Sequence, residues 1–226
     1  MKKSYVAIAG ALLAQLLLAA YLYPSLPDSI VTHWDAAGAP NGYMPKLFGL
    51  SIIPAITAVL ILMFAAIPRI DPLGANVRKF RRQYGWFVAV LALFMLALQA
   101  EVVLWNIGVF VSPNVVLSVG MAALFFYAGV LFESAKRNWF VGIRTPWTMS
   151  SERVWDRTHK LAGKLFKAAG VLAAAGALLP EYAVLLVLAP VMIVAIYSVA
   201  YSYVEYKKGR RRSASRFIST CVKRRS

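Results

Sequence analysis

Residues 47–67 read LFGLSIIPAITAVLILMFAAI and contain no charged side chain. An α-helix rises about 1.5 Å per residue, so a segment of this length crosses the hydrocarbon layer of a bilayer, which is about 30 Å thick. Four more segments have similar length and composition, and a fifth is shorter but follows an amphipathic run. They cover residues 5–23, 85–110, 115–132, 182–203 and 165–179. The pattern predicts an all-α, polytopic membrane protein with a six-helix transmembrane bundle.

The overall composition agrees with this class. The chain has 226 residues, of which 60% are hydrophobic, and its mean hydropathy is +0.64; soluble domains are roughly half apolar. Lys2 and Lys3 precede the first apolar run, as in a secretory signal peptide, but that run is longer than the core of about 7–15 residues in such peptides. We therefore expect a first span that is not cleaved. The single cysteine, Cys221, excludes an internal disulfide.

The lysines and arginines are distributed very unevenly along the chain. If the N-terminus lies inside, 24 of the 25 fall in cytoplasmic segments and only Lys46 lies outside. This asymmetry follows the positive-inside rule and predicts that both termini are cytoplasmic. The net charge of +16 is then explained by topology and by contact with anionic membrane lipids, so we expect no direct binding of nucleic acid.

This topology divides the chain into three parts. Residues 1–67 hold the first two spans and an outer loop, residues 24–46. Residues 68–204 hold four further spans and an inner loop, residues 133–164. Residues 205–226 form a basic cytoplasmic tail.

The outer loop reads LPDSIVTHWDAAGAPNGYMPK over residues 26–46. Its prolines and glycines predict turns, the tightest of them at Pro-Asn-Gly, residues 40–42. The stretch IVTHWD is β-branched enough to be extended, which would direct His33 and Asp35 to one side. Two ligands are too few for zinc, and the other histidine, His159, is expected across the membrane. No metal or other cofactor is therefore predicted.

Two interpretations of the outer loop remain open. It is either a compact cap, with Trp34 and Tyr43 resting at the membrane interface, or a recognition surface for something that arrives from outside. In the second case His33, Trp34, Asp35 and Tyr43 are the candidate contacts.

The inner loop contains NWFVGIRTPWTMSSERVWDRTH, residues 138–159. Thr145 precedes Pro146, which favours an extended backbone and holds Arg144 and Trp147 at defined positions. Arg144 can bind a carboxylate or a phosphate through two parallel hydrogen bonds. The alternative is that it is one more positive-inside arginine beside an interfacial tryptophan.

A helix is predicted after this turn, with Ser150 as its cap and Glu152 in its first turn. Trp155 and His159 fall on a face of this helix that carries little charge, and the opposite stripe is basic. A basic amphipathic helix usually lies on anionic lipid, but it can also dock a cytosolic partner. The stripe consists of Arg153, Arg157, Lys160, Lys164 and Lys167.

Inside the bundle, ionisable residues are scarce. Glu101 lies about 24 Å from Gly85 along its helix, close to the outer interface, so a snorkelling carboxylate is favoured over a proton relay. Ala169, Ala173 and Ala177 repeat at every fourth position, which predicts close helix packing. The sequence lacks a nucleophile–base pair and a phosphate-binding glycine loop, so no enzyme is predicted.

Two sets of residues carry a resemblance to a known family. The inner-loop set resembles the signature of the SdpI immunity-protein family: Asn138, GIRTPWT at 142–148, Ser151, Glu152, Trp155, His159 and Gly163. The outer-loop set resembles the N-terminal domain of unknown function that often accompanies it: Leu26, Pro27, His33, Trp34, Gly38, Asn41, Gly42 and Lys46. Together the two sets imply that the resemblance covers nearly the whole chain.

The resemblance implies a multi-pass plasma-membrane protein of bacteria that gives immunity to a secreted, membrane-active peptide toxin. It also implies signalling, in which the toxin-engaged protein holds a cytosolic transcriptional repressor at the membrane. The alternative is a small multi-pass transporter or exporter. The residues expected to bind the peptide or a partner are His33, Trp34, Asp35, Tyr43, Asn138, Gly142, Arg144, Thr145, Pro146, Trp147, Thr148, Trp155 and His159.

Overall fold

The computed structural model describes residues 2–223, and it describes the side chains of residues 2–210. Six long helices form the molecule: α1 (Lys2–Leu22), α2 (Lys46–Ile70), α4 (Arg81–Asn106), α5 (Pro113–Ser134), α7 (Glu152–Ala175) and α8 (Ala183–Lys223). Short helices lie between them: η1 (Tyr23–Ser25), α3 (Gly74–Lys79), α6 (Pro146–Ser150) and η2 (Pro180–Tyr182). The last three residues of the predicted tail, 224–226, lie outside the described residues.

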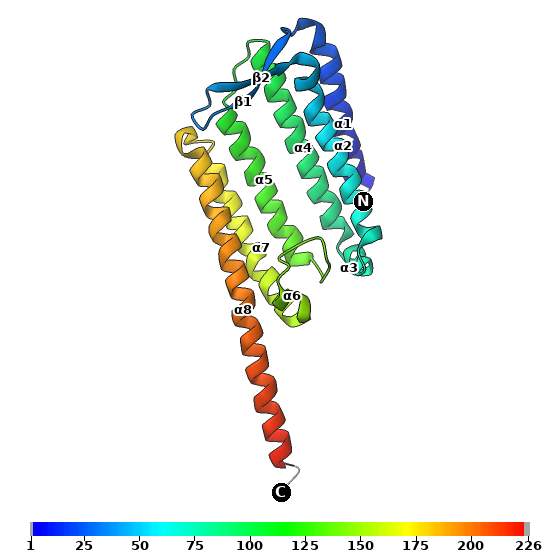
Figure 1. The fold of residues 1–226 in the computed structure, drawn as a ribbon, viewed down its shortest axis with the longest axis vertical. Helices are drawn as coiled ribbons and strands as arrows, with labels where there is room; N and C mark the ends of the chain where they lie inside the picture. The colour runs from blue at the N-terminus through cyan, green and yellow to red at the C-terminus, as the bar shows by residue number, and fades with distance from the viewer. Residues whose placement is uncertain (1, 224–226) are drawn as a thin grey trace.

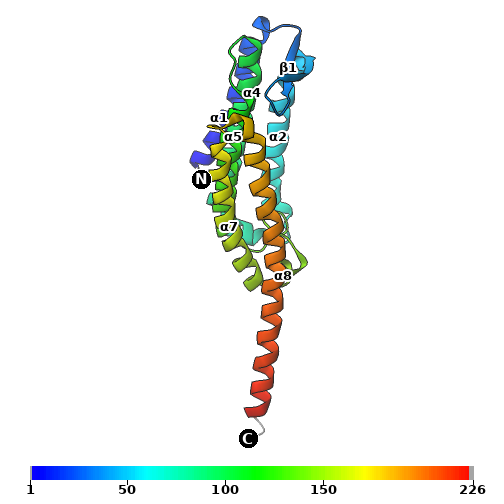
Figure 2. The same cartoon turned by 90° about the vertical axis from the view of Figure 1, so that its left-hand side faces the viewer.

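The long helices run side by side and form a narrow bundle (Figures 1 and 2). α4 packs on α1, α2 and α5, and α7 packs on α5 and α8. A β-hairpin covers one end of the bundle, here called the hairpin end, and α3 and α6 lie at the other, the loop end. Helix α8 continues well beyond the loop end, and the chain begins in the half of the bundle nearer that end.

Five of these helices, α1, α2, α4, α5 and α8, are long and apolar enough to cross a membrane. The chain is therefore an essentially all-α, multi-pass membrane protein, as the sequence predicts. The expected short span at residues 165–179 is not a separate helix. It joins the preceding amphipathic run in the continuous helix α7, which ends at Ala175. The count of six spans and the cytoplasmic placement of both termini stay predictions.

Small residues bring α5 and α7 close together. A Cβ added at Gly129 would lie 2.4 Å from the carbonyl oxygen of Gly163, and one at Gly170 would lie 2.8 Å from that of Ala122. Ala169 and Ala173 are buried, and Ala173 packs with Phe125 of α5 and Val187 of α8. Ala177, the third alanine of the repeat, lies beyond the end of α7 and is partly buried. The predicted close packing of this helix is thus confirmed for its described side chains.

The hairpin pairs β1 (Ser29–Trp34) with β2 (Pro40–Pro45) in antiparallel register, with irregular pairing around His33. The expected tight turn at residues 40–42 is wrong, because those residues belong to β2. The chain turns at Asp35 instead, whose Oδ1 accepts hydrogen bonds from the backbone N–H groups of Ala37 and Ala39, both at 2.9 Å. Gly38 supplies the positive φ of 84° that this turn requires.

Two contacts fix the hairpin to the bundle. The Asn106 side chain, at the end of α4, accepts from the backbone N–H of Val31 at 2.8 Å and donates to its carbonyl at 2.9 Å. Ile30 is fully buried beneath the hairpin and packs with Leu50 and Val103. The hairpin is therefore held in place as part of the bundle.

Candidate functional site

Helices α6 and α7 occupy much of the expected inner loop, residues 133–164, and leave residues 135–145 as its non-helical part, to which the name inner loop is now restricted. This segment is folded around one amide side chain. Asn138 is fully buried, and its Oδ1 accepts from the backbone N–H groups of Phe140 at 2.9 Å and Val141 at 2.6 Å. Its Nδ2 donates to the carbonyls of Lys136 at 2.8 Å and Val141 at 2.9 Å. One side chain thus makes four hydrogen bonds that close the loop on itself.

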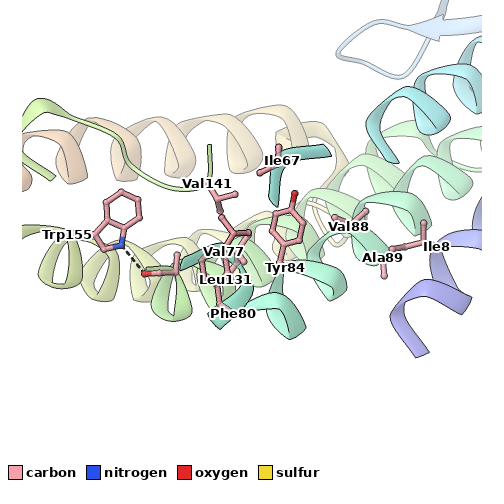
Figure 3. Packing of buried hydrophobic residues seen from close by; sticks show 11 residues of the cluster. Ile8, Ile67, Val77, Phe80, Tyr84, Val88, Ala89, Leu131, Val141 and Trp155 are labelled. Atoms are coloured by element: carbon pink, nitrogen blue, oxygen red, sulfur yellow. Dashed lines mark hydrogen bonds between the residues drawn. The ribbon is translucent and has the colours of Figure 1, made fainter. Parts of the chain in front are cut away.

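Trp155 and His159, one turn apart on α7, stack beneath this loop with ring centroids 3.9 Å apart. Both are buried, and the indole N–H of Trp155 donates to the carbonyl of Ala135 at 2.9 Å, at the edge of the apolar cluster drawn in Figure 3. The Nε2 of His159 accepts from the backbone N–H of Ile143 at 2.9 Å, so its Nδ1 carries the proton and donates to the Trp155 carbonyl. These two residues hold the loop and are not available to a partner at the surface.

His159 lies in the charged half of α7, before its apolar residues 165–175. Burial lowers the pKa of His159 to about 4. Gly142 completes this arrangement with a φ of +114°, and a Cβ there would lie 2.3 Å from His159 Nε2. Only glycine allows the loop to approach the imidazole this closely.

The RTPWT turn, residues 144–148, connects the loop to α8. Thr145 caps α6 in a reciprocal capping box with Thr148, and its hydroxyl lies 3.1 Å from that of Ser202 on α8. Trp147 packs on Tyr203 of α8, with ring centroids 4.9 Å apart. The cap of α7 is Ser151, whose Oγ accepts from the N–H of Val154, and not Ser150 as the sequence suggested.

The exposed residues of the loop are two aromatics, Trp139 and Phe140, and two basic residues, Lys136 and Arg144. Trp139 is 51% exposed and Phe140 is 38% exposed, and Arg144 beside them donates to the carbonyl of Trp139. Arg144 therefore lies at the surface, as a partner-binding residue would. Sequence reasoning missed Trp139 and Phe140, although two adjacent aromatics in a polar loop are a usable signal.

The basic stripe of α7 is partly neutralised by acids that the sequence did not single out. Glu205 of α8 has a nearly buried side chain and lies 2.8 Å from Arg157, 3.7 Å from Arg153 and 3.3 Å from Lys208. Lys167 pairs with Glu133 of α5 at 2.8 Å. Lys160 and Lys164 are exposed, and together with the paired Arg157 they line a shallow hollow between α7 and α8 that Tyr201 also borders.

At the hairpin end, an open cavity of about 470 Å³ lies beneath β1 and its turn. Residues of α2, α4, α5 and α8 line it, among them Ile53, Val102 and Leu117. Glu101 also lines it and is only 5% exposed. The prediction of a snorkelling carboxylate is therefore wrong, because the Glu101 side chain is buried in the protein and borders a cavity.

The four predicted outer-loop residues lie in different surroundings. His33 is exposed, with its Nδ1 2.5 Å from Asn41 Oδ1, and Tyr43 is 63% exposed on β2. Trp34 is partly buried against Trp105, with ring centroids 5.4 Å apart. Asp35 uses one carboxylate oxygen to form the hairpin turn. His33, Trp34 and Asp35 border the cavity, whereas Tyr43 is not among its lining residues.

The described residues contain no group of three or more histidine, cysteine, aspartate or glutamate side chains that could hold a metal ion. His33 is in the hairpin and His159 is beneath the inner loop, at opposite ends of the bundle (Figure 1).

The fold and these two ends define a class: a multi-pass helical membrane protein with a structured cap at each end of its bundle. Residues 134–202, which include the inner loop, α6, α7 and the first part of α8, match the model of the SdpI/YfhL protein family. Residues 10–58, which include the hairpin, match a domain of unknown function, DUF1648. The resemblance predicted from the sequence is thereby confirmed.

Similarity to one characterised relative extends along most of the chain. The chain is 25% identical over 209 residues to a protein named Immunity protein SdpI from Bacillus subtilis (strain 168). The aligned part covers 92% of this chain and 98% of that protein. No solved structure matches the chain.

Proposed function

We propose that this chain is an integral membrane immunity protein that protects its cell against a secreted, membrane-active peptide. The supporting observation is that similarity to an immunity protein covers 92% of the chain, and so takes in both structured ends. The structure adds that Asn138, Trp155 and His159 of the signature are buried and build the inner loop.

In this proposal the hairpin end faces outward, since the lysines and arginines lie almost entirely in the segments of the other end. The peptide meets the exposed His33 and Tyr43 and the cavity beneath β1. At the loop end, Arg144, Trp139 and Phe140 form the exposed surface that a cytosolic partner such as a transcriptional repressor would contact. Bacterial membrane lipids surround the bundle and contact the free lysines of α7.

The remaining signature residues have positioning roles in this proposal. Asn138, Thr145, Thr148, Trp155 and His159 are buried, Gly142 lies against His159, and the exposed Pro146 begins α6; in the proposal these residues set the surface without touching a partner. Trp147 orients the loop by packing on α8.

The experiment that tests immunity is survival of a toxin-sensitive strain that expresses the chain, compared with the same strain carrying an empty vector. We expect protection from the wild-type chain and from a Trp139→Ala, Phe140→Ala double variant, because the exposed aromatics face away from the toxin. Signalling is read separately, as capture of a repressor by the membrane fraction, and we expect the double variant to lose it. Unchanged sensitivity at normal membrane levels of the wild-type chain contradicts immunity to that toxin.

The cavity at Glu101 favours one alternative, a small transporter or exporter. Transport predicts substrate flux in proteoliposomes that falls when Glu101 is replaced by glutamine. The residues that line this cavity belong to the hairpin end of the bundle, which fits ligand binding from one side better than passage across it.

A further inference from the structure

We propose that the cavity beneath the hairpin binds an ammonium group carried on an apolar body, with Glu101 as its counter-ion. The assignment of this ammonium group to the peptide, as a lysine side chain or as the peptide's N-terminus, rests on the proposed function. The binding chemistry itself rests on the cavity alone.

The cavity has the size and lining of a small-ligand site. Its volume of about 470 Å³ lies in the usual range for pockets that hold small organic groups. Apolar side chains from four helices contribute to its wall: Ile53, Leu98, Val102, Leu117 and Val184. Such a wall favours the hydrocarbon part of a ligand, and a few polar groups then decide which ligand binds.

Glu101 is the polar group that carries the proposal. Its side chain is buried, and its Oε1 has no hydrogen-bond partner among the described residues. The amide of Asn114, which also lines the cavity, donates to the carbonyls of Ala36 and Pro180, both at 3.0 Å, so its N–H groups are committed elsewhere. An unpaired buried carboxylate is costly, and a bound cation offsets that cost.

A second unpaired group agrees with a ligand that derives from a peptide. The indole N–H of Trp34, another lining residue, is buried and has no acceptor among the residues that the structure describes. An ammonium group next to a carbonyl oxygen, as in a peptide, can satisfy both the carboxylate and the indole.

The charges around the cavity mouth favour a simple cation. Asp28 is paired with Lys46 at 3.1 Å, which leaves Asp35, Glu101 and Glu181 as the other acids of the hairpin end. Glu181 lines an adjoining hollow of about 420 Å³ that shares Asn114 with the cavity. Glu181 is exposed and does not line the cavity itself, so water screens its charge and Glu101 supplies the counter-charge inside the site. The buried carboxylate attracts an ammonium group and repels the phosphate of a zwitterionic amine lipid.

The test uses the full chain in nanodiscs of phosphatidylcholine, with hexylammonium as the probe and hexanol as its neutral counterpart. Saturation-transfer NMR measures binding to the wild type, to Glu101→Gln and to the matched control Glu181→Gln, which removes a charge from an exposed position nearby. We expect saturable binding of hexylammonium by the wild type and Glu181→Gln, and affinity lower by about 10- to 100-fold in Glu101→Gln. Equal affinities in the wild type and Glu101→Gln, or for the two probes, overturn the proposal.

Two further experiments identify the molecule to which the ammonium group belongs. Adding phosphatidylethanolamine to the nanodiscs should leave hexylammonium binding unchanged; competition would assign the site to a lipid amine and overturn the peptide assignment. In the survival assay, Glu101→Gln should lose protection while Glu181→Gln keeps it. If Glu101→Gln protects fully, the peptide does not use this cavity, but the proposed immunity function is not contradicted. If the wild type fails to protect, the immunity function is contradicted, but the proposed amine site is not.

Discussion

Replacing Asn138 by alanine tests whether the inner loop is a built structure or a passive connector. The substitution removes four hydrogen bonds, of which the two to Val141 are buried and cannot be replaced by water. A net value of about 1 kcal/mol per bond, reduced for the two bonds to the more exposed Lys136 and Phe140, gives a loss of about 3 kcal/mol. The free energy of unfolding should fall by that amount.

The assay is reversible unfolding in mixed micelles, followed by tryptophan fluorescence, because Trp155 is buried beneath this loop. The matched control is Asn76→Ala, which also lies at the loop end and removes only two hydrogen bonds: a part-buried one donated to the carbonyl of Arg137 at 2.8 Å and an exposed one accepted from Lys79 at 2.9 Å. The control should lose less than about 1 kcal/mol. If Asn138→Ala lowers the free energy of unfolding no more than the control does, the four hydrogen bonds of Asn138 do not stabilise the fold as argued.

Three further outcomes are expected at the loop end. Gly142→Ala should lower the free energy of unfolding by about 2–4 kcal/mol, because it combines a strained φ with a collision against His159; a stability within experimental error of wild type would contradict this. The unfolded chain protonates His159 near pH 6.5 but the folded chain only near its pKa of about 4, so stability should fall by roughly 2–3 kcal/mol from pH 7 to pH 4.5. His159→Gln should show a weaker pH dependence in thermal unfolding. Glu205→Gln should cost about 1–3 kcal/mol through its pair with Arg157, whereas Glu152→Gln, whose side chain is exposed, should cost almost nothing in the same assay.

The membrane class follows directly from the sequence, because apolar runs of span length have few other structural solutions. The continuous helix α7 is harder to predict, since its first half is charged and its second half is short and rich in alanine. Neither half meets a criterion for a transmembrane helix alone. Their continuity depends on packing against α5, where Gly129 and Gly163 let the backbones meet.

Only part of the candidate site can be predicted from the sequence. The residue types of Asn138, Gly142 and His159 mark the inner loop as special, but the pattern does not say that they bond to one another. The same holds for Glu101, whose depth along α4 is predictable and whose exposure is not. Whether it faces lipid or a cavity is decided by the hairpin above it and by neighbouring helices, which are distant in sequence.

The unbroken course of α7 has a mechanical consequence. At about 1.5 Å per residue, its 24 residues make a rod of about 36 Å, with the Trp155–His159 stack near one end and η2 after the other. Asn114 ties η2 to the hairpin turn through Pro180 and Ala36. A rod of this length acts as a lever arm: a tilt of about 3° at one end displaces the other by about 2 Å, which exceeds the tolerance of a hydrogen bond. We therefore expect that a change in the hairpin that tilts α7 by this amount strains the bonds that hold the inner loop.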